Sequence, residues 1–438
     1  MRSGNETGRK KLSAGTKFML VLAAVVIVGS VLVLGKLSSG AKVDLSKLNM
    51  NVLDLKEDPS RNNEETTEAK QGTAARPAKQ SGQSDAPATA KPQSEASFTL
   101  TAGGSISLSG EVRKNSKSTD AKVADYADIM MLLAPQIRSD VNAVFFENIL
   151  SDRHKASDSV APAQSASLLT EAGFNMAACG FSQAYSSGKD GVEATLISLD
   201  SKGITALGIR YADHMGTPEV RTVNGVKAAF LQYTDTVPAK TRKTMEKDGT
   251  GGMVPTADPD MIAQDIDIAR LQGAEAVIVF VSWGKTGAAA PDKNQRELAG
   301  KIAEAGADLI IGNGSHIPQA AEYLTGANGK NVLCVWSLGT LLSGDRSNIK
   351  RISGWLLHVT IRSDGQGGVT VLNPEYTPVY TWKYKQDGRF YYRCIASGNE
   401  APDGMDSEQR KMTAKSAETV RTALKDAPLG ERGSEDGP

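Results

Sequence analysis

Four histidines and three cysteines are the residues of this chain best suited to metal binding or nucleophilic chemistry, and they are few for 438 residues. They are His154, His214, His316, His358, Cys179, Cys334 and Cys394. Three cysteines cannot form a disulfide framework, or a four-cysteine zinc site, by themselves. Fifty basic and fifty acidic residues give a net charge of zero, whereas binding to a phosphate backbone needs surplus Lys and Arg. We therefore expect little imidazole-based metal chemistry and no nucleic-acid partner.

The elements that must position any site alternate between strands and helices from Phe98 to about Ser397. A fully apolar run at 276–281 predicts a strand buried on both faces. Asp258-Pro259 predicts the start of a helix that ends at Leu271 before Gly273. Further helices are predicted over 126–137, 165–172, 190–199 and 294–305, with strands at 98–102, 142–146, 174–179, 308–311, 331–337 and 354–362. This alternation predicts an α/β fold with a mostly parallel or mixed sheet flanked by helices.

The two ends of the chain lack the alternation of strands and helices that is predicted for the middle. Residues 18–35 form an uncharged apolar run of 18 residues, which as a helix spans about 27 Å and suffices for a bilayer core. Arg9, Lys10, Lys11 and Lys17 precede it, so the positive-inside rule predicts a cytoplasmic tail over 1–17 and an external main domain. A cleaved signal peptide is the alternative, but its apolar region is normally only 7–15 residues long.

Residues 57–96 contain no Val, Ile, Leu, Met, Phe, Tyr or Trp, and include four prolines. Such a segment buries too little apolar area to offset its ordering entropy, so 36–96 are expected to form a stalk and a disordered linker. A hairpin is predicted over 379–395 around Gln386-Asp387-Gly388. A polar surface helix is predicted over 408–425, followed by a loose tail.

The order of motifs in the folded part resembles the bacterial CapA (PgsA) family of capsule and poly-γ-glutamate synthesis proteins. The resemblance runs from about Phe98 to Ile395. It rests on scaffold motifs at 203–208, 279–284, 305–312, 316–319 and 337–339. It implies a metallophosphatase-like α/β sandwich over 97–397, followed by a C-terminal polar helix and tail over 398–438. In this family, metal ligands follow the carboxyl ends of the strands, as functional loops do in such sheets.

The first two ligand positions of the family are replaced in this chain. Its first strand normally ends in Gly-Asp, and here Gly103 is followed by Gly104. Its second normally ends in Asn-Leu-Glu, and here Asn148 is followed two residues later by Leu150. Glu147 precedes this motif, and in a regular strand it points to the opposite face from Leu150. We therefore expect Glu147 to be a poor substitute for the missing carboxylate.

The remaining ligand motifs have also lost most of their donors. They correspond to Phe181-Ser182-Gln183, Ser282-Trp283-Gly284, Gly312-Asn313-Gly314-Ser315-His316 and Ser337-Leu338-Gly339-Thr340-Leu341. A dinuclear site needs several carboxylate, imidazole and amide ligands converging on two cations. One imidazole among neutral side chains cannot supply them, so we expect no metal, no other cofactor and no family-type catalytic residue.

A pocket left by these losses is expected to retain Asn148, Gln183, Ser282, Trp283, Asn313 and His316 as binding residues. For His316 a structural role is favoured over that of a leftover pocket residue, and Trp283 could equally be a packed aromatic residue. The first functional hypothesis is a membrane-anchored, non-catalytic protein that binds a capsule or cell-wall polymer or its synthesis and export proteins. The alternative is a hydrolase or transferase that acts on an envelope polymer through other residues, which requires Gln183, Ser282 and His316 to converge. A purely structural spacer is the third possibility.

Overall fold

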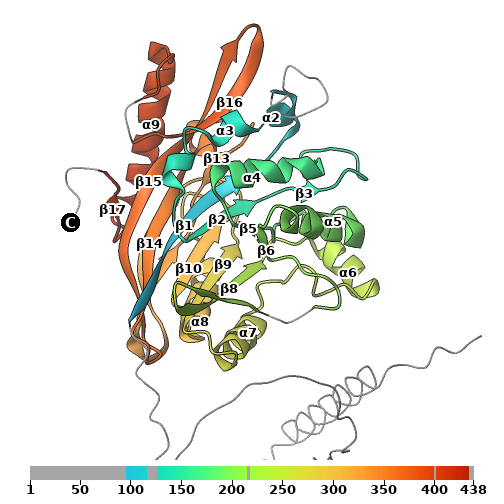
Figure 1. Ribbon diagram of the computed structural model, residues 1–438, viewed down its shortest axis with the longest axis vertical. Helices are drawn as coiled ribbons and strands as arrows, with labels where there is room; N and C mark the ends of the chain where they lie inside the picture. Colours follow the sequence, from blue (N-terminus) through green and yellow to red (C-terminus); the bar gives the residue numbers. More distant parts are fainter. Residues whose placement is uncertain (1–94, 116–125, 215–217, 399–400, 434–438) are drawn as a thin grey trace, which may run out of the picture. The chain divides into compact units, whose positions relative to one another are not determined.

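The computed structural model describes residues 95–115, 126–214, 218–398 and 401–433, and Figure 1 shows their arrangement. The predicted cytoplasmic tail, the predicted transmembrane segment 18–35 and nearly all of the predicted linker lie outside these residues. In the described part of the chain, no helix has the length and apolar character needed to cross a membrane.

The larger sheet combines parallel strands in its centre with an antiparallel wing. Its strands are β1 (Ala96–Ile106), β2 (Val141–Phe146), β5 (Met176–Ala178), β6 (Thr205–Leu207), β13 (Thr340–Leu342), β14 (Ser353–Ser363), β15 (Val369–Gln386), β16 (Arg389–Ala396) and β17 (Gly430–Glu431). They run in the order β16-β15-β14-β1-β2-β5-β6, with β13 beside β1 and β17 beside β15. The strands β1, β2, β5 and β6 are mutually parallel, so their carboxyl ends share one edge.

The smaller sheet is also mixed, with parallel strands inside and an antiparallel strand at each end. Its strands are β7 (Glu219–Val223), β8 (Val226–Thr234), β9 (Ala276–Ser282), β10 (Leu309–Asn313), β11 (Ala321–Thr325) and β12 (Asn331–Val335). The order is β11-β12-β10-β9-β8-β7. A short separate pair is formed by β3 (Ile149–Leu150) and β4 (Val160–Ala161).

Helices and short 3-10 turns connect these strands. The helices are α2 (Gly110–Asn115), α3 (Ala127–Met130), α4 (Ser167–Ala172), α5 (Gly188–Asp200), α6 (Ala239–Lys247), α7 (Pro259–Leu271), α8 (Lys293–Glu304) and α9 (Ser407–Leu424). The 3-10 turns are η2 (Ala134–Gln136), η3 (Ala163–Ala166), η4 (Ala327–Gly329) and η5 (Ile349–Ile352).

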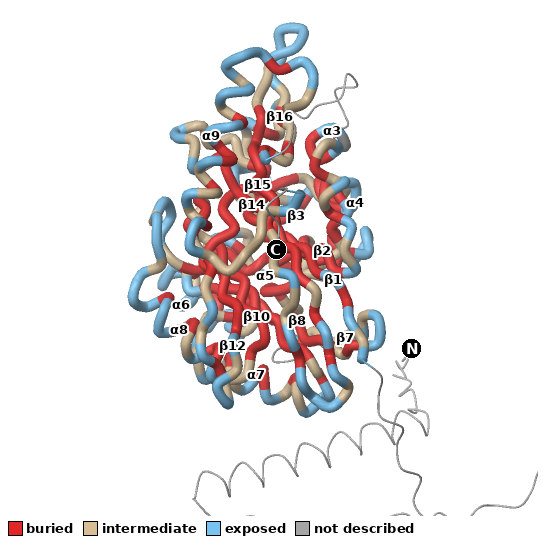
Figure 2. Tube along the Cα trace, turned by 90° about the vertical axis from the view of Figure 1, so that its left-hand side faces the viewer, coloured by how far each residue is buried: buried red, intermediate tan, exposed pale blue. Residues whose placement is uncertain are grey.

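The two sheets pack face to face through one apolar layer. Phe145 of β2 meets Phe280 of β9 edge-on, with ring centroids 5.8 Å apart. On the outer faces, α4 and α5 contribute to the core of the larger sheet, and α7 and α8 to that of the smaller one. Figure 2 shows buried residues running through the strands and exposed ones concentrated in the outer helices and loops. The predicted mixed α/β arrangement is confirmed, as two stacked sheets between helices.

Local signals placed several elements correctly. Asp258 caps α7 by accepting hydrogen bonds from the backbone N–H groups of Asp260 and Met261. The helix predicted over 126–137 is interrupted instead, because Pro135 lacks an N–H and its ring blocks a continuous helix. The C-terminal helix α9 packs against β14, β15 and η5, and it buries Ala417, Val420 and Leu424. The helix therefore has one buried side, in addition to the polar surface that the sequence predicts.

His358 is a buried histidine at the centre of the larger sheet. Its Nδ1 lies 3.0 Å from both Thr101 Oγ1 and Arg432 Nη1, and its Nε2 lies 3.0 Å from Thr377 Oγ1. Burial lowers the pKa of His358 to about 3, and the guanidinium of Arg432 acts in the same direction. The folded protein therefore holds this imidazole neutral, in a structural role.

The neutral state of His358 makes stability depend on pH. The unfolded chain takes up a proton at His358 as the pH falls below about 6.5, whereas the folded chain does so only near 3. The free energy of unfolding should therefore fall by on the order of 2 kcal/mol through this residue between pH 7 and pH 5. In urea titrations of His358→Gln, the free energy of unfolding should fall by about 2 kcal/mol less between pH 7 and pH 5 than it does in the wild-type protein. The same substitution at the exposed His214 is the control, and an equal slope in both variants would contradict the assignment.

Candidate functional site

The carboxyl ends of the central strands of both sheets meet at one end of the molecule. A chain of three hydrogen bonds joins them. Ser337 Oγ donates to Asn313 Oδ1 at 2.9 Å, Asn313 Nδ2 donates to Ser105 Oγ at 2.7 Å, and Ser105 Oγ donates to Glu147 Oε1 at 2.6 Å. The last distance is typical of a hydroxyl bonded to a carboxylate. Since Ser105 is the second-last residue of β1 and Asn313 is the last of β10, these bonds connect the larger sheet to the smaller one.

A second polar bridge crosses between the sheets at the same end. Gln232 of β8 accepts from the backbone N–H of Gly180 and donates to its carbonyl, both at 2.9 Å. Its side-chain nitrogen also lies 3.3 Å from Ser282 Oγ. All three residues are buried, so this polar pairing replaces the water that the groups would otherwise bind.

Glu147 and His316 lie next to each other beside this network. His316 Nδ1 is 3.5 Å from Glu147 Oε2, and their side chains are 29% and 15% exposed. His316 has a φ of 56°, an uncommon conformation for a residue with a Cβ, and its carbonyl accepts from Thr340 Oγ1 at 2.9 Å. Of the two interpretations left open for His316, the structure supports the residue of a pocket.

Glu147 and His316 open onto a cavity of about 180 Å³, which we call the Glu147 pocket. It is lined by Ser105, Ser107, Glu147, Thr286, His316, Thr340, Leu342, Ser343, Asp345 and Arg351. A neighbouring hollow of about 430 Å³ shares Ser107 and Glu147 with it, and also contains Ser182 and Gln183. Glu147 therefore stands between two solvent-accessible spaces.

The structure corrects two predictions about ligand positions. Gly104 does not face the pocket, because a Cβ there would collide with the carbonyl of Gly339, and the pocket-facing position is Ser105. The prediction that Glu147 points away from the site is also wrong. It assumed a regular strand, but β2 ends at Phe146 and the chain turns before β3.

The six predicted site residues divide into three groups. His316 lines the Glu147 pocket and the exposed Gln183 lines the neighbouring hollow, whereas Asn313 is fully buried, bonds Ser105 and lines neither space. Ser282 is buried beside Gln232 and lines neither space. The two others are structural and are described next.

Asn148 and Trp283 pack inside the protein instead of lining the pocket. Asn148 is 1% exposed, accepts from the backbone N–H of Leu108 at 2.7 Å and donates to the carbonyl of Asp158 at 3.1 Å. Trp283 is fully buried, stacks on Trp336 with ring centroids 5.5 Å apart and donates from Nε1 to the Trp336 carbonyl at 2.9 Å. The packed-aromatic interpretation of Trp283 is therefore the one that the structure supports.

The side chains present do not fit a dinuclear metal centre. The hydroxyl of Ser105 and both polar side-chain atoms of Asn313 are already hydrogen-bonded within the protein. Of the pocket's carboxylates and imidazoles, Asp345 is paired with Arg351 at 3.0 Å. Glu147 and His316 then remain as possible metal ligands. Over the described ranges, no group of three or more His, Cys, Asp or Glu side chains is arranged to hold a metal ion.

Sequence reasoning missed Ser105, Glu147 and Gln232. Ser105 lies one residue after Gly104, which the sequence motif places at the first ligand position. Gln232 did carry a signal, since it is a polar residue within the apolar run of β8, and such residues need a buried partner.

The fold and site together define a class: a two-sheet α/β sandwich with a polar pocket at the shared strand ends and few metal ligands. The chain belongs to the bacterial capsule synthesis protein family PGA_cap, whose model matches residues 99–345. This match confirms the resemblance inferred from the scaffold motifs.

Two relatives have names that refer to capsule or PGA biosynthesis. The PGA biosynthesis protein CapA of Bacillus subtilis (strain 168) is 27% identical over 260 residues, which cover 57% of this chain and 65% of that protein. The capsule biosynthesis protein CapA of Bacillus anthracis is 30% identical over 125 residues, 28% of each chain. The matches therefore span less than two thirds of each relative.

Solved structures show weaker likenesses. The NAD nucleotidase NadN of Haemophilus influenzae has a TM-score of 0.41 and 11% identity, over 77% of this chain and 57% of that one. The calcineurin-like phosphoesterase YfkN of Bacillus subtilis has a TM-score of 0.36 and 13% identity, over 75% and 99%.

Gly314 is the position where the family motif would place another histidine. Its φ of 124° is open to glycine but strained for other residues, and a Cβ there would collide with the backbone of Trp283. Gly314→Ala should therefore lower the free energy of unfolding by more than about 2 kcal/mol in urea titrations. Gly329→Ala is the matched control, because its φ is also positive but nothing lies near its Cβ position, and about 1 kcal/mol is expected. Equal losses at both glycines would contradict the crowding at Gly314.

Proposed function

We propose that this protein is a membrane-anchored, extracytoplasmic and non-catalytic component of capsule, poly-γ-glutamate or other envelope-polymer assembly. Its domain would be a metallophosphatase-like scaffold that binds the polymer or the proteins that make and export it. The observation that carries the non-catalytic part is the hydrogen-bond chain from Ser337 to Glu147. It occupies the polar groups at the strand ends that would otherwise be free to bind metal ions.

The cellular placement rests on the sequence of the N-terminal segment. An uncharged apolar run over 18–35, preceded by basic residues, favours a single-pass anchor with a cytoplasmic N-terminus. Residues 36–96 would then hold the domain away from the membrane surface. Family membership and the names of the two relatives support a role in polymer assembly.

An enzyme acting on an envelope polymer is the second candidate. Its support is the contact of Ser105 with Glu147 beside His316, in a pocket open to solvent. The version that requires Gln183, Ser282 and His316 to converge is weakened, because Ser282 is buried beside Gln232. Any catalysis would have to depend on Glu147 and His316.

A complementation experiment separates the two candidates. In a host from which the gene has been deleted, the wild-type chain should restore surface polymer, measured as the acidic polymer released per cell. A Glu147→Gln/His316→Gln variant should lower it by no more than about fivefold, because a binding protein loses contacts at these side chains but needs no proton transfer there. Equal protein levels, checked by immunoblot, are the control. A fall of about a hundredfold or more, the size typical of a lost general acid or base, would favour the enzyme.

Metal content gives an independent test. The full chain, purified after growth with added manganese and zinc, should contain far less than one equivalent of either metal, because two converging ligands bind a divalent ion weakly. Elemental analysis of the protein before and after a brief chelator wash measures this. One or two equivalents that survive the wash would overturn the non-catalytic proposal.

A further inference from the structure

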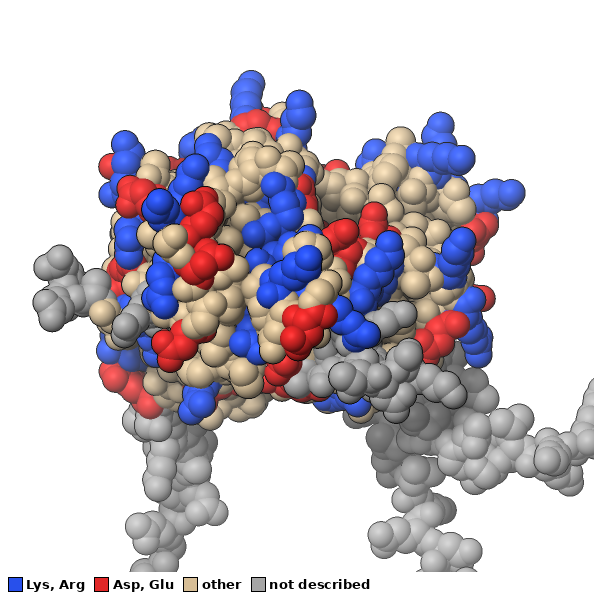
Figure 3. Space-filling model, turned by 90° about the horizontal axis from the view of Figure 1, so that it is seen from above, with Lys and Arg blue, Asp and Glu red and all other residues tan. Residues whose placement is uncertain are grey.

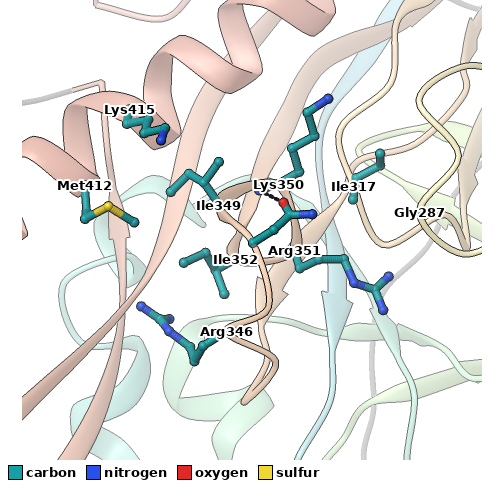
Figure 4. A pocket seen from close by; sticks show the side chains of 10 residues that line it. Gly287, Ile317, Arg346, Ile349, Lys350, Arg351, Ile352, Met412 and Lys415 are labelled. Atoms are coloured by element: carbon teal, nitrogen blue, oxygen red, sulfur yellow. Dashed lines mark hydrogen bonds between the residues drawn. The ribbon is translucent and has the colours of Figure 1, made fainter.

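A third and larger cavity, of about 580 Å³, lies between η5 and α9. Figure 4 shows its lining, which comes from η5, α9, the segment before η5 and two loops of the smaller sheet. Its basic residues are Arg346, Lys350, Arg351 and Lys415, and its apolar residues include Ile317, Ile349, Ile352 and Met412. We call this space the cationic cavity.

The charge of the cationic cavity is mostly uncompensated. Its lining contains no Asp or Glu, and within the described ranges Arg351 is the one of the four cations that forms an ion pair, with Asp345 at 3.0 Å. Among the described residues, Arg346, Lys350 and Lys415 form no ion pair. On the face seen in Figure 3, both basic and acidic side chains are present. Like charges gathered around a hollow raise the local potential and attract an anion.

Two of the four basic groups are held in place before any ligand arrives. Arg346 donates to the carbonyl of Thr381 at 2.6 Å and to Tyr380 Oη at 3.2 Å, and its guanidinium lies 5.8 Å from the Tyr380 ring centroid. Arg351 is held by Asp345 and lies 3.5 Å from the carbonyl of Ser315. Fixed side chains lose less entropy on binding, so the site is partly preorganised. Lys350 and Lys415 are exposed and free to adjust.

The floor of the cavity is apolar and recessed. Ile317 and Ile352 are only 3% and 2% exposed, and Ile349 and Met412 are half-buried. A membrane-binding surface would instead project its apolar side chains outward. The combination of an apolar floor and a basic rim matches carboxylates carried on short aliphatic stems, since methylene groups contact the floor while the charges reach the rim.

The cationic cavity adjoins the Glu147 pocket. Arg351 lines both spaces, and neighbouring residues of the same loops, Thr286 with Gly287 and His316 with Ile317, are divided between them. The backbone N–H of Gly287 donates to the Ser315 carbonyl at 2.7 Å, which ties these two loops together. A linear ligand seated in the cationic cavity would therefore continue past Arg351 toward Glu147 and His316.

We propose that the cationic cavity binds a segment of a linear polycarboxylate, with its acidic groups on Arg346, Lys350 and Lys415 and its aliphatic stems on Ile349 and Met412. The choice of a polycarboxylate among anionic chains rests in part on the proposed function. The site itself rests on the cavity, its unpaired cations and its apolar floor.

Fluorescence anisotropy with the purified full chain and labelled poly-γ-glutamate of defined length tests this site. Lys350→Glu/Lys415→Glu should weaken binding about tenfold or more, because two attractive contacts become repulsive. Lys202→Glu/Lys243→Glu is the matched control, since both lysines are exposed, lie outside the cavity and carry the same change in net charge. Met412→Gln should weaken binding a few-fold without changing its salt dependence, which tests the apolar floor. Thermal unfolding of each variant checks that it folds.

Three results would overturn the inference. One is no binding by the wild-type chain, and another is an equal loss in the two lysine double variants, which would indicate unspecific charge attraction. The third is tighter binding to polyphosphate of matched charge, or to vesicles containing phosphatidylglycerol, than to the polycarboxylate. If the wild-type chain restores surface polymer in the deleted host but any of these results is obtained, the proposed function stands and only this site falls.

Discussion

Burial of polar strand ends between two sheets is the constraint on which the rest of this structure depends. Where β1 and β10 end, side chains leave the apolar layer but are still shielded from water, so each polar atom needs a partner inside the protein. Asn313 and Ser105 satisfy each other across the sheets, and Gln232 does the same with the backbone of Gly180. These neutral bridges hold the loops that carry Glu147 and His316, and so set the shape of the pocket.

Elements with local signals could be predicted from the sequence. The cap at Asp258 and the glycine after Leu271 marked α7, and the turn at Asp387-Gly388 marked the hairpin between β15 and β16. The apolar run of β9 indicated a strand buried on both faces, because no residue in it alternates with a polar one. In each case the information lies within a few residues of the element, so no knowledge of the remaining fold was required.

The site was predicted less well because its geometry depends on distant contacts. Whether Gly104 or Ser105 faces the pocket is decided by the backbone of Gly339, more than two hundred residues away in the chain. Glu147 points into the pocket because β2 ends one residue before it, and the pattern of apolar residues does not mark that end. The sequence leaves Trp283 open as a binding residue, and only the structure shows that it stacks on Trp336. Residue types were therefore informative about the chemistry, but not about which side chains share the pocket.

The contact between Gly314 and Trp283 has a consequence for anyone who wishes to engineer a dinuclear metal centre into this scaffold. Exchanging residues at the ligand positions one at a time would fail, because the backbone at Gly314 leaves no room for a side chain and Trp283 is fixed from below by Trp336. The loop would have to be rebuilt first, because the space is occupied by the backbone of Trp283, which a smaller side chain would not clear. The barrier to a dinuclear metal centre therefore lies in the order of the changes as well as in their number.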